Sequence, residues 1–268
     1  MSIEDLFCAV AALVPARRDA SSIVVLCYHR LDDHLDGSPL DRFTIRPELF
    51  VRHLSIIHES GLNVIGPDEF WKVEGPAVMI TFDDNLVSHV RNALPVLNDF
   101  GAKATFFLNP AELDEPGLLT SSDVESLLSG GMWVGAHSDN LRVVSRFASD
   151  EFERKVSKHR EFLESLGMPL TWAYPGGHIG SFDTKHDEIL TQYGFDLRFS
   201  TLEMPCDDQN PHRVQGRYVI RKNCTRRYFR SALAGGLQLL RWYKVARAKL
   251  LPISGSTNGA IGSDRSAS

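Results

Sequence analysis

The chain has 268 residues, of which 43% are hydrophobic, 24% charged and 9% aromatic. This composition is typical of globular proteins and excludes the collagen-like, low-complexity and disordered classes. The length fits two small domains or one domain the size of an α/β barrel. No apolar run reaches the roughly 20 residues that a bilayer span needs. The apolar run at 6–14 follows Glu4 and Asp5 instead of a basic segment, so we expect no signal peptide and a cytoplasmic protein.

In chain order, short β-branched runs alternate with amphipathic helical patterns. An N-terminal helical segment at 1–22 is followed by a strand at Ile23–Cys27, a helix at Pro47–Ser60, strands at Leu62–Ile65 and Val78–Phe82, a helix at Val87–Phe100, a strand at Ala104–Leu108, a helix at Ser121–Ser129 capped by Ser121 or Ser122, a strand at Trp133–Ala136, a helix at Asp150–Leu166, a strand at Trp172–Tyr174, a helix at Lys185–Tyr193, and strands at Leu197–Ser200 and Tyr218–Ile220. The alternation predicts an α/β fold, a distorted (β/α) barrel of about seven parallel strands over residues 23–223. A basic amphipathic helix at 224–251 and a disordered tail at 252–268 complete the expected single domain.

Charge is distributed unevenly along the chain. The net charge of −5 suggests no nucleic-acid partner. Residues 213–250 contain eleven Lys or Arg and no acidic residue. Because the whole chain has a net charge of −5, the rest of the chain has a net charge of −16. The basic helix is either solvated or a peripheral contact with the inner face of an anionic membrane. The cysteines form no C-x-x-C pair and are expected to be small buried hydrophobes: Cys8, Cys27, Cys206 and Cys224.

Ionisable residues follow four of the expected strands. Barrels of this kind carry their sites at the carboxyl ends of the strands. The segments are Tyr28-His29-Arg30, Asp83-Asp84-Asn85, His137-Ser138-Asp139 and Tyr174-Pro175-Gly176-Gly177-His178. Two adjacent Asp residues after a strand are most often a turn or a helix cap. Four such segments at matching positions nevertheless indicate a site.

The residue types in these segments suit metal-assisted hydrolysis. Asp84 and His137, with a bound water, can hold a divalent ion such as Zn²⁺, which lowers the pKa of that water towards ~7. Asp83 could take the proton of the water. A backbone N–H of the turn 174–177 could stabilise a developing oxyanion.

Together these segments resemble a known family. Thr81-Phe82-Asp83-Asp84, Gly135-Ala136-His137-Ser138 and Trp172-Ala173-Tyr174-Pro175-Gly176-Gly177 are similar to the three motifs of the polysaccharide deacetylases, which are carbohydrate esterase family 4 or the nodulation protein B homology domain. The similarity extends over residues 24–30, 43–50, 104–108 and 216–218, and so covers roughly 23–223.

The resemblance implies a role for each matching residue. Asp83 would be the catalytic base, the Gly176 N–H an oxyanion donor, and Arg217 the residue that orients Asp83. Asp84 and His137 would bind zinc, cobalt or nickel. The residues expected to line the substrate groove, which would take an N-acetylated oligo- or polysaccharide, are Tyr174, Pro175, His29 and His178.

The sequence departs from the family pattern at three points. Leu141 stands four residues after His137, where the family has a second His ligand, and Asn85 replaces a Gly. No His remains after Arg221 to act as the late general acid, and His212 is a weak substitute. The third metal ligand therefore stays open among Asp139, His29 and His178, with Asp139 nearest in sequence. The histidines on helical patterns are expected to be solvated: His89, His159 and His186.

Our leading hypothesis is a metal-dependent hydrolase that removes N-acetyl groups from amino sugars of a glycan or glycan precursor. The alternative is a catalytically impaired barrel that binds carbohydrate or a partner protein, which Leu141 and the missing late His favour. A glycosidase using Asp83 and Asp84 is disfavoured, because adjacent residues rarely flank a glycosidic bond at the ~5 to 9.5 Å that this chemistry needs.

Overall fold

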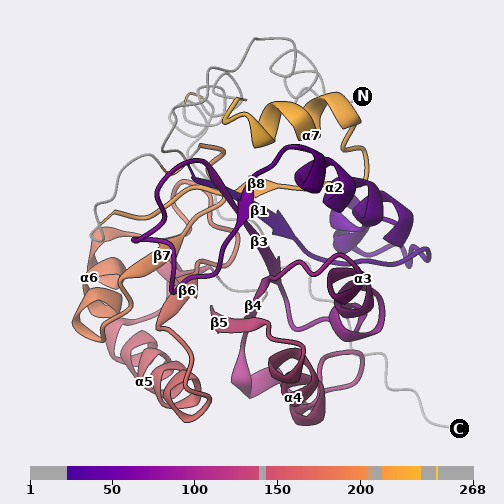
Figure 1. The fold of residues 1–268 in the computed structure, drawn as a ribbon. Helices are drawn as coiled ribbons and strands as arrows, with labels where there is room; N and C mark the ends of the chain where they lie inside the picture. The colour runs from indigo at the N-terminus through magenta and orange to yellow at the C-terminus, as the bar shows by residue number, and fades with distance from the viewer. Residues whose placement is uncertain (1–22, 139–142, 205, 207–212, 237–245, 247–268) are drawn as a thin grey trace, which may run out of the picture.

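The computed structural model describes residues 23–138, 143–204, 206, 213–236 and 246. Within these ranges eight strands form one sheet in the order β7-β6-β5-β4-β3-β1-β8, and β2 pairs separately with β3. All pairings of these strands are parallel. The strands are β1 Ile23–Tyr28, β2 Asn63–Val64, β3 Ala77–Asp83, β4 Thr105–Leu108, β5 Trp133–His137, β6 Thr171–Ala173, β7 Leu197–Phe199 and β8 Tyr218–Val219. The sheet is curled and helices surround it (Figure 1), which confirms the predicted distorted barrel.

The helices lie where the periodicity predicts them, with two local differences. They are α2 Pro47–Glu59, α3 Leu94–Asp99, α4 Ser121–Ser129, α5 Ser149–Ser165, α6 Thr184–Gln192 and α7 Arg226–Leu233. The helix expected at 87–100 begins as a π-helical turn, His89–Ala93, before α3. Pro95 explains the break, because it lacks the N–H that a regular α-helix needs at that position. The cap of α4 is Thr120, which forms a capping box with Asp123, so the expectation of Ser121 or Ser122 was wrong.

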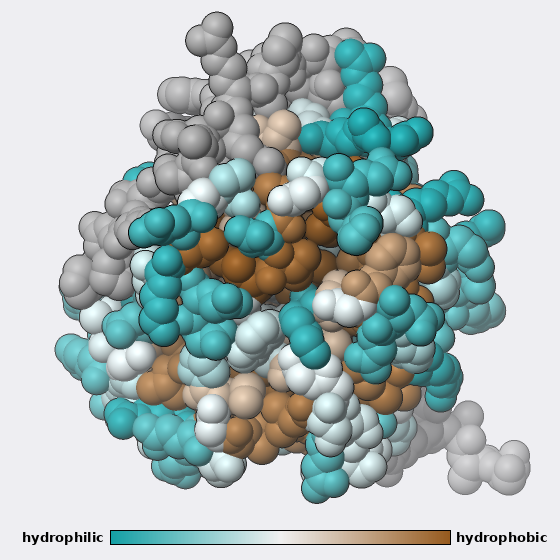
Figure 2. Space-filling model, in the orientation of Figure 1, coloured by the Kyte–Doolittle hydropathy of each residue, from teal (hydrophilic) through white to brown (hydrophobic). Residues whose placement is uncertain are grey.

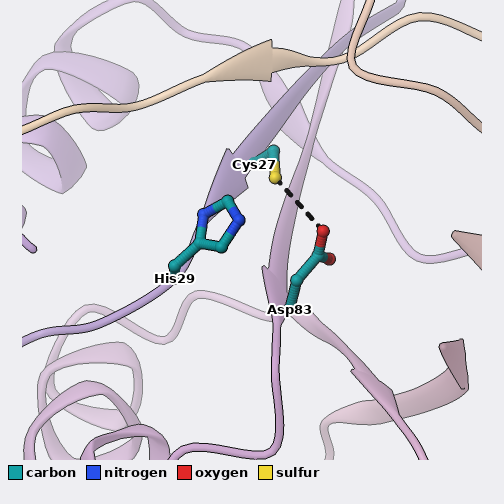
Figure 3. A group of neighbouring side chains, drawn as sticks. All are labelled: Cys27, His29 and Asp83. Atoms are coloured by element: carbon teal, nitrogen blue, oxygen red, sulfur yellow. Dashed lines mark hydrogen bonds between the residues drawn. The ribbon is translucent and has the colours of Figure 1, made fainter. Parts of the chain in front are cut away.

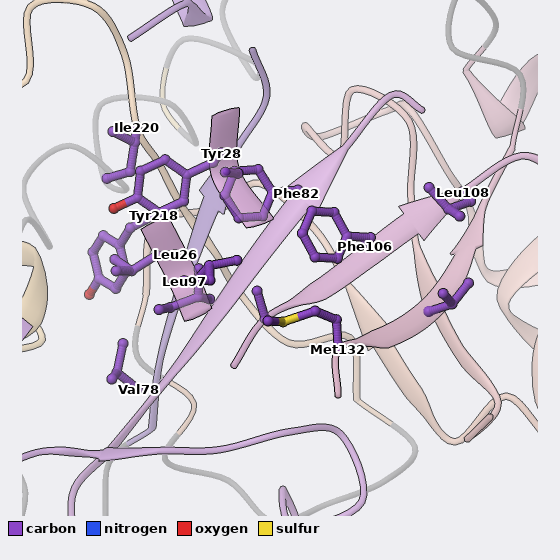
Figure 4. Close-up of a cluster of buried hydrophobic side chains, with 14 of the residues drawn as sticks. Leu26, Tyr28, Val78, Phe82, Leu97, Phe106, Leu108, Met132, Tyr218 and Ile220 are labelled. Atoms are coloured by element: carbon purple, nitrogen blue, oxygen red, sulfur yellow. The ribbon is translucent and has the colours of Figure 1, made fainter. Parts of the chain in front are cut away.

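Side chains of the strands alternate between two hydrophobic clusters. One set packs against the surrounding helices and includes Val24. Figure 4 shows Leu26, Tyr28, Val78 and Phe82 of the same set. The residues between them fill the inside of the barrel, together with Phe70 from the loop after β2: Ile23, Val25, Met79, Phe107 and Phe199. Since strand side chains alternate with a period of two, the next inward positions at the carboxyl ends of β1 and β3 are Cys27, Thr81 and Asp83.

The segment before β8 joins the two ends of the curled sheet. Gln215 forms a parallel bridge with Phe199 of β7, donates its N–H to Arg198 and accepts the N–H of Ser200. β8 then pairs with β1 on the other side. This path places Arg217, between the bridge and β8, inside the barrel, where it is 0% exposed.

Helix α7 buries its apolar face against the protein. Tyr228, Phe229 and Leu233 are buried, while Arg226 and Arg230 are exposed. In α7 this face packs against α2 and the core, so α7 gives no support to a membrane contact, and most of the basic segment 224–251 lies outside the described residues. No helix in the described part of the chain is both long and apolar enough to cross a bilayer.

The remaining sequence expectations divide between described and undescribed residues. The three described cysteines, Cys27, Cys206 and Cys224, are buried and unbridged as predicted. The segments expected at 1–22 and 252–268, and most of 234–251, lie outside the described residues. In the orientation of Figure 1, hydrophobic surface gathers near the middle of the molecule and hydrophilic residues surround it (Figure 2). Among the described residues, the exposed large hydrophobics are Leu35, Val51 and Ile179.

Candidate active site

A buried ion pair lies at the carboxyl end of β3. The two guanidinium nitrogens of Arg217, Nη1 and Nη2, each donate to a different carboxylate oxygen of Asp83 at 2.7 Å. Arg217 also donates to the Ser200 carbonyl and to the Thr81 hydroxyl, at 3.2 Å each. Its guanidinium lies over the Phe107 ring, 5.4 Å from the centroid. Arg217 therefore fixes both oxygens of Asp83 in one orientation.

The Cys27 thiol and the His29 imidazole also face Asp83 (Figure 3). The thiol donates to Asp83 Oδ2 at 3.5 Å, and one ligand atom from each of the three residues lies within 4.8 Å of the others. Burial raises the pKa of the Cys27 thiol well above its ordinary value, which keeps it protonated. A protonated thiol and a carboxylate already paired with Arg217 are poor ligands for a cation.

The carboxylate of Asp84 lies between two imidazoles. Its Oδ1 is 3.4 Å from Nε2 of His137, and its Oδ2 is 4.0 Å from Nε2 of His29. His137 Nδ1 donates to the Ala173 carbonyl at 2.8 Å, because a carbonyl oxygen can only accept. In the neutral ring this bond leaves the lone pair on Nε2, directed at Asp84, as in metal-binding histidines.

The pKa values of the site reflect burial opposed by neighbouring charges. Burial alone would raise the pKa of Asp83, but Arg217, with His137 and His29, holds that pKa well below its usual range. Burial likewise opposes ionisation of Asp84, yet His137 and His29 keep its pKa below the ordinary value. Burial lowers the pKa of His29. Burial by itself would also lower the pKa of His137, but the carboxylates of Asp83 and Asp84 raise that pKa above its ordinary value. Asp83 and Asp84 are therefore ionised at neutral pH.

The backbone after β3 is bent by two residues with positive φ. Asp84 has φ +79° and Asn85 has φ +43°, a region that costs a residue other than Gly of order 1–3 kcal/mol. The buried Asn85 side chain offsets this cost, because its Nδ2 donates to the Asn109 carbonyl and its Oδ1 accepts the Asn109 N–H, both at 2.8 Å. Asn in place of the family's Gly therefore adds a tie to the end of β4.

The turn after β6 is tied to the loop after β7. Thr201 donates its hydroxyl to the Gly176 carbonyl at 2.7 Å and its N–H to the Gly177 carbonyl at 2.9 Å. Gly176 has φ +69° and is exposed. Among the described residues its N–H has no hydrogen-bond acceptor. The N–H of this exposed residue is therefore available as a donor, and the His178 ring lies beside it, 3.4 Å from the position a Cβ on Gly176 would take.

The structure separates the other residues expected at the substrate groove. The Tyr174 side chain is buried, stacks on Phe182 and donates its hydroxyl to Asp187 at 2.6 Å, so it cannot line a groove. That expectation was wrong, because the β6 alternation directs Tyr174 towards the helices. Pro175 is also buried, whereas His178 is exposed. The residues Asp139, Leu141 and His212 lie outside the described residues.

The expectation of solvated helical histidines was wrong. All three are at most 4% exposed, and each reaches a backbone carbonyl through Nε2: His89 that of His29 at 3.0 Å, His159 that of His137 at 2.9 Å, and His186 that of Phe147 at 3.1 Å. Sequence reasoning missed them because helical periodicity does not say which polar residue of the inner face meets a carbonyl. His89 and His159 thereby hold the backbone of His29 and His137, which lie at the site.

The carboxylates and histidines gather at the carboxyl ends of the strands of a curled parallel sheet, which is where β/α barrels carry their active sites. Residues 72–197 match the family model for polysaccharide deacetylase. The match spans slightly less than half of the chain, and it confirms the resemblance to this family of carbohydrate deacetylases that was drawn from the motifs.

Individual relatives are distant in sequence. YxkH of Bacillus subtilis, whose name assigns it provisionally to the polysaccharide deacetylases, is 19% identical over 211 residues, which is 75% of this chain and 71% of the relative. The solved structure of the Streptococcus pyogenes deacetylase PplD in complex with acetate is 20% identical with a TM-score of 0.70, and 80% of this chain and 99% of that chain are covered. The structure of IcaB from Ammonifex degensii is 23% identical with a TM-score of 0.66, and the match covers 85% of this chain and 100% of that chain. The two structures show that the fold is shared.

Proposed function

We propose that this protein is a metal-dependent hydrolase that removes N-acetyl groups from amino sugars of a glycan or glycan precursor. The proposal is supported chiefly by the position of Asp84, which directly follows the clamped Asp83 and has a carboxylate oxygen 3.4 Å from Nε2 of His137. The match to the polysaccharide deacetylase model supplies the proposed substrate class, an acetylated polysaccharide.

The donor set fits a divalent ion such as zinc, cobalt or nickel. A tetrahedral ion with ligand bonds of about 2.1 Å spaces its ligand atoms about 3.4 Å apart, which is the Asp84 to His137 distance. The bond from His137 Nδ1 to Ala173 supplies the outer-shell partner that metal-binding histidines usually have. When bound there, the ion would polarise the acetyl carbonyl and make a water acidic.

Asp83 is proposed as the general base. Its carboxylate is ionised at neutral pH, buried, and oriented by both nitrogens of the Arg217 fork. It can accept the proton of the attacking water and return it to the leaving amine of the sugar. Arg217 is a positioning residue in this scheme, because both of its hydrogen bonds to Asp83 hold the base without contact with the substrate.

The turn after β6 is proposed to stabilise the oxyanion. An N–H that is already directed to solvent needs no rearrangement to donate to a developing negative charge. Gly176 is exposed, and Thr201 fixes the turn by donating to the carbonyl oxygens of Gly176 and Gly177. His178 lies close enough to contact a sugar bound over this turn.

The second candidate is a barrel that binds acetylated carbohydrate without turning it over. Leu141, at the position of the family's second His ligand, is the observation in its favour. A site with only Asp84 and His137 as protein ligands should hold a metal weakly. The two candidates differ in whether acetate is released.

The test is acetate release from N-acetylglucosamine oligomers by metal-stripped protein, with Zn²⁺, Co²⁺ or Ni²⁺ added back. We expect metal-dependent release, and about a 10²- to 10⁴-fold loss of kcat in Asp83→Asn. Asp99→Asn, at an exposed position at the end of α3, is the matched control and should retain activity. If folded wild-type protein releases no acetate from several such substrates with any of the three metals, the hydrolase proposal fails and the binding candidate is favoured.

A further inference from the structure

We infer that Arg42, Arg221 and Lys222 form a phosphate-binding subsite at the mouth of the barrel, and that the acetylated amino sugar carries a phosphate group there. The inference rests on the proposed function and names its substrate more closely, as a phosphorylated glycan precursor. It starts from the basic stretch that the proposed function does not use. The described part of that stretch, 213–236, contains seven Lys or Arg and no acidic residue.

The strand pairing brings Arg221 to the mouth, where the carboxyl ends of the strands lie. β8 pairs with β1 in parallel (Figure 1), and beyond β8 the N–H of Ile220 donates to the Cys27 carbonyl at 2.8 Å. Ile220 belongs to the hydrophobic cluster outside the sheet, so alternation places Arg221 on the inner side. Arg221 therefore leaves the barrel beside the end of β1, the strand that His29 follows, and it is half-buried.

The Phe43 ring connects two of the cations to the candidate active site. It stacks on the His29 imidazole with centroids 4.7 Å apart, and His29 Nε2 is 4.0 Å from a carboxylate oxygen of Asp84. The guanidinium carbon of Arg42 is 4.6 Å from the centroid of the Phe43 ring, and that of Arg221 is 6.0 Å from the same centroid. Both guanidiniums thus lie one aromatic ring away from the imidazole that faces Asp84.

The loops that carry the three cations are tied together. Lys222 donates its N–H to the Arg42 carbonyl at 3.1 Å, so the loop after β8 meets the loop after β1. The side chains of Arg42 and Lys222 belong to exposed residues. The acids closest to Arg42 in sequence, Asp36 and Asp41, both pair with Arg30. In the described part of the chain no carboxylate pairs with Arg42 or Lys222, so both charges are available to an anionic ligand.

The chemistry of these side chains favours a phosphate as the ligand. A guanidinium binds phosphate oxygens through two parallel N–H groups, and an ammonium adds a compact charge. A phosphate monoester carries up to two charges and three acceptor oxygens, whereas a carboxylate carries one charge and two oxygens. In a 2-acetamido sugar the carbon that bears the acetamide is next to the anomeric carbon. A phosphate on the anomeric oxygen would therefore lie beside the reacting amide, as the subsite lies beside Asp84.

The decisive measurement is the ratio of two affinities, obtained by calorimetric titration of the metal-free full chain with N-acetylglucosamine 1-phosphate and with the neutral methyl glycoside. We expect the phosphate to bind at least about tenfold more tightly, because a hydrogen bond to a charged group contributes about a factor of ten or more. Arg42→Gln and Arg221→Gln should each lower this ratio about tenfold. Arg52→Gln, at an exposed position of α2, is the matched control and should keep the wild-type ratio.

The ratio also separates a subsite from a structural role of the cations. Lost packing would weaken the binding of both sugars together, whereas a lost subsite weakens the binding of the phosphate alone. Equal affinities of the wild type for the two sugars, or a wild-type ratio in both Arg42→Gln and Arg221→Gln, overturn the inference. N-acetylglucosamine linked through pyrophosphate to a nucleoside or to a short prenyl chain then identifies the source of the phosphate, and tighter binding of either than of the methyl glycoside supports the subsite.

Acetate release distinguishes failure of this inference from failure of the proposed function. With Zn²⁺ added, we expect kcat/KM for the 1-phosphate to exceed that for the methyl glycoside at least about tenfold, the factor expected for binding. Acetate released from both sugars with equal kcat/KM and equal affinities overturns the subsite and leaves the hydrolase intact. An affinity ratio of ten or more that falls in Arg221→Gln, without acetate release, supports the subsite and counts against the hydrolase.

Discussion

Replacing the catalytic base also breaks a buried ion pair, and the structure predicts how much stability this costs. Asp83→Asn removes the negative charge that faces Arg217 but leaves the guanidinium fully buried inside the barrel. The Asn amide can accept only one of the two hydrogen bonds that the carboxylate accepts now. Loss of activity in this variant therefore has two causes unless folding is measured separately.

The magnitude follows from the geometry of the pair. Each of the two 2.7 Å bonds is charge-assisted, a type worth about 1.5–3 kcal/mol net. Removing one partner of a buried pair costs about 3–5 kcal/mol, because the remaining charge loses its compensation. We expect Arg217→Met to cost less than Asp83→Asn, since without the guanidinium the pKa of Asp83 rises and the carboxyl can become neutral.

Urea unfolding of metal-free protein, followed by circular dichroism, measures this cost. With an m-value of about 3 kcal/mol/M, a loss of about 3–5 kcal/mol lowers the midpoint by about 1–1.7 M. The double variant of Asp83→Asn and Arg217→Met should be more stable than the sum of the single changes predicts, with a coupling of about 2 kcal/mol or more. A midpoint that moves by less than about 0.3 M in Asp83→Asn, or additive single changes, would refute the reasoning.

Three further predictions concern other parts of the molecule. Burial lowers the pKa of His53 from 6.5 to about 3, so this ring is neutral in the folded protein while the unfolded chain takes up the proton below pH 6.5. Stability therefore falls as the pH falls, by roughly 1.4 kcal/mol between pH 8 and pH 5.5. His53→Phe keeps the stack on Phe229, and in urea titrations at the two pH values it should lose that much less stability than the wild type. Gly177→Ala places a Cβ 2.5 Å from the Thr201 nitrogen, on a residue whose φ is +55°. We expect the free energy of unfolding to fall by about 2 kcal/mol and the Tm by about 4–8 °C. An unchanged Tm would contradict the close approach. Zn²⁺ at 100 times its Kd should stabilise the wild type by about 2.7 kcal/mol and raise its Tm, and an equal rise in Asp84→Asn would show that the ion binds elsewhere.

The sequence predicts the architecture because the pattern of local signals repeats. Seven or so apolar β-branched runs separated by amphipathic helices leave a parallel barrel as the solution that buries both faces of the sheet. The residues after the strands could be assigned to one end of the barrel for the same reason. Asp83, Asp84 and His137 converge there as the strand order requires.

The side-chain pairings depend on tertiary structure. Neither composition nor period says that a loop tied to β7 carries Arg217 into the barrel, that His29 faces Asp84 while Tyr174 turns away, or that His89 is buried beneath a strand end. Each pairing joins residues on different elements, and the energy that decides it is the cost of burying a charge or a polar ring without a partner. Local pattern thus determines which residues meet at the barrel mouth, and desolvation in the folded protein determines which of them bond to each other.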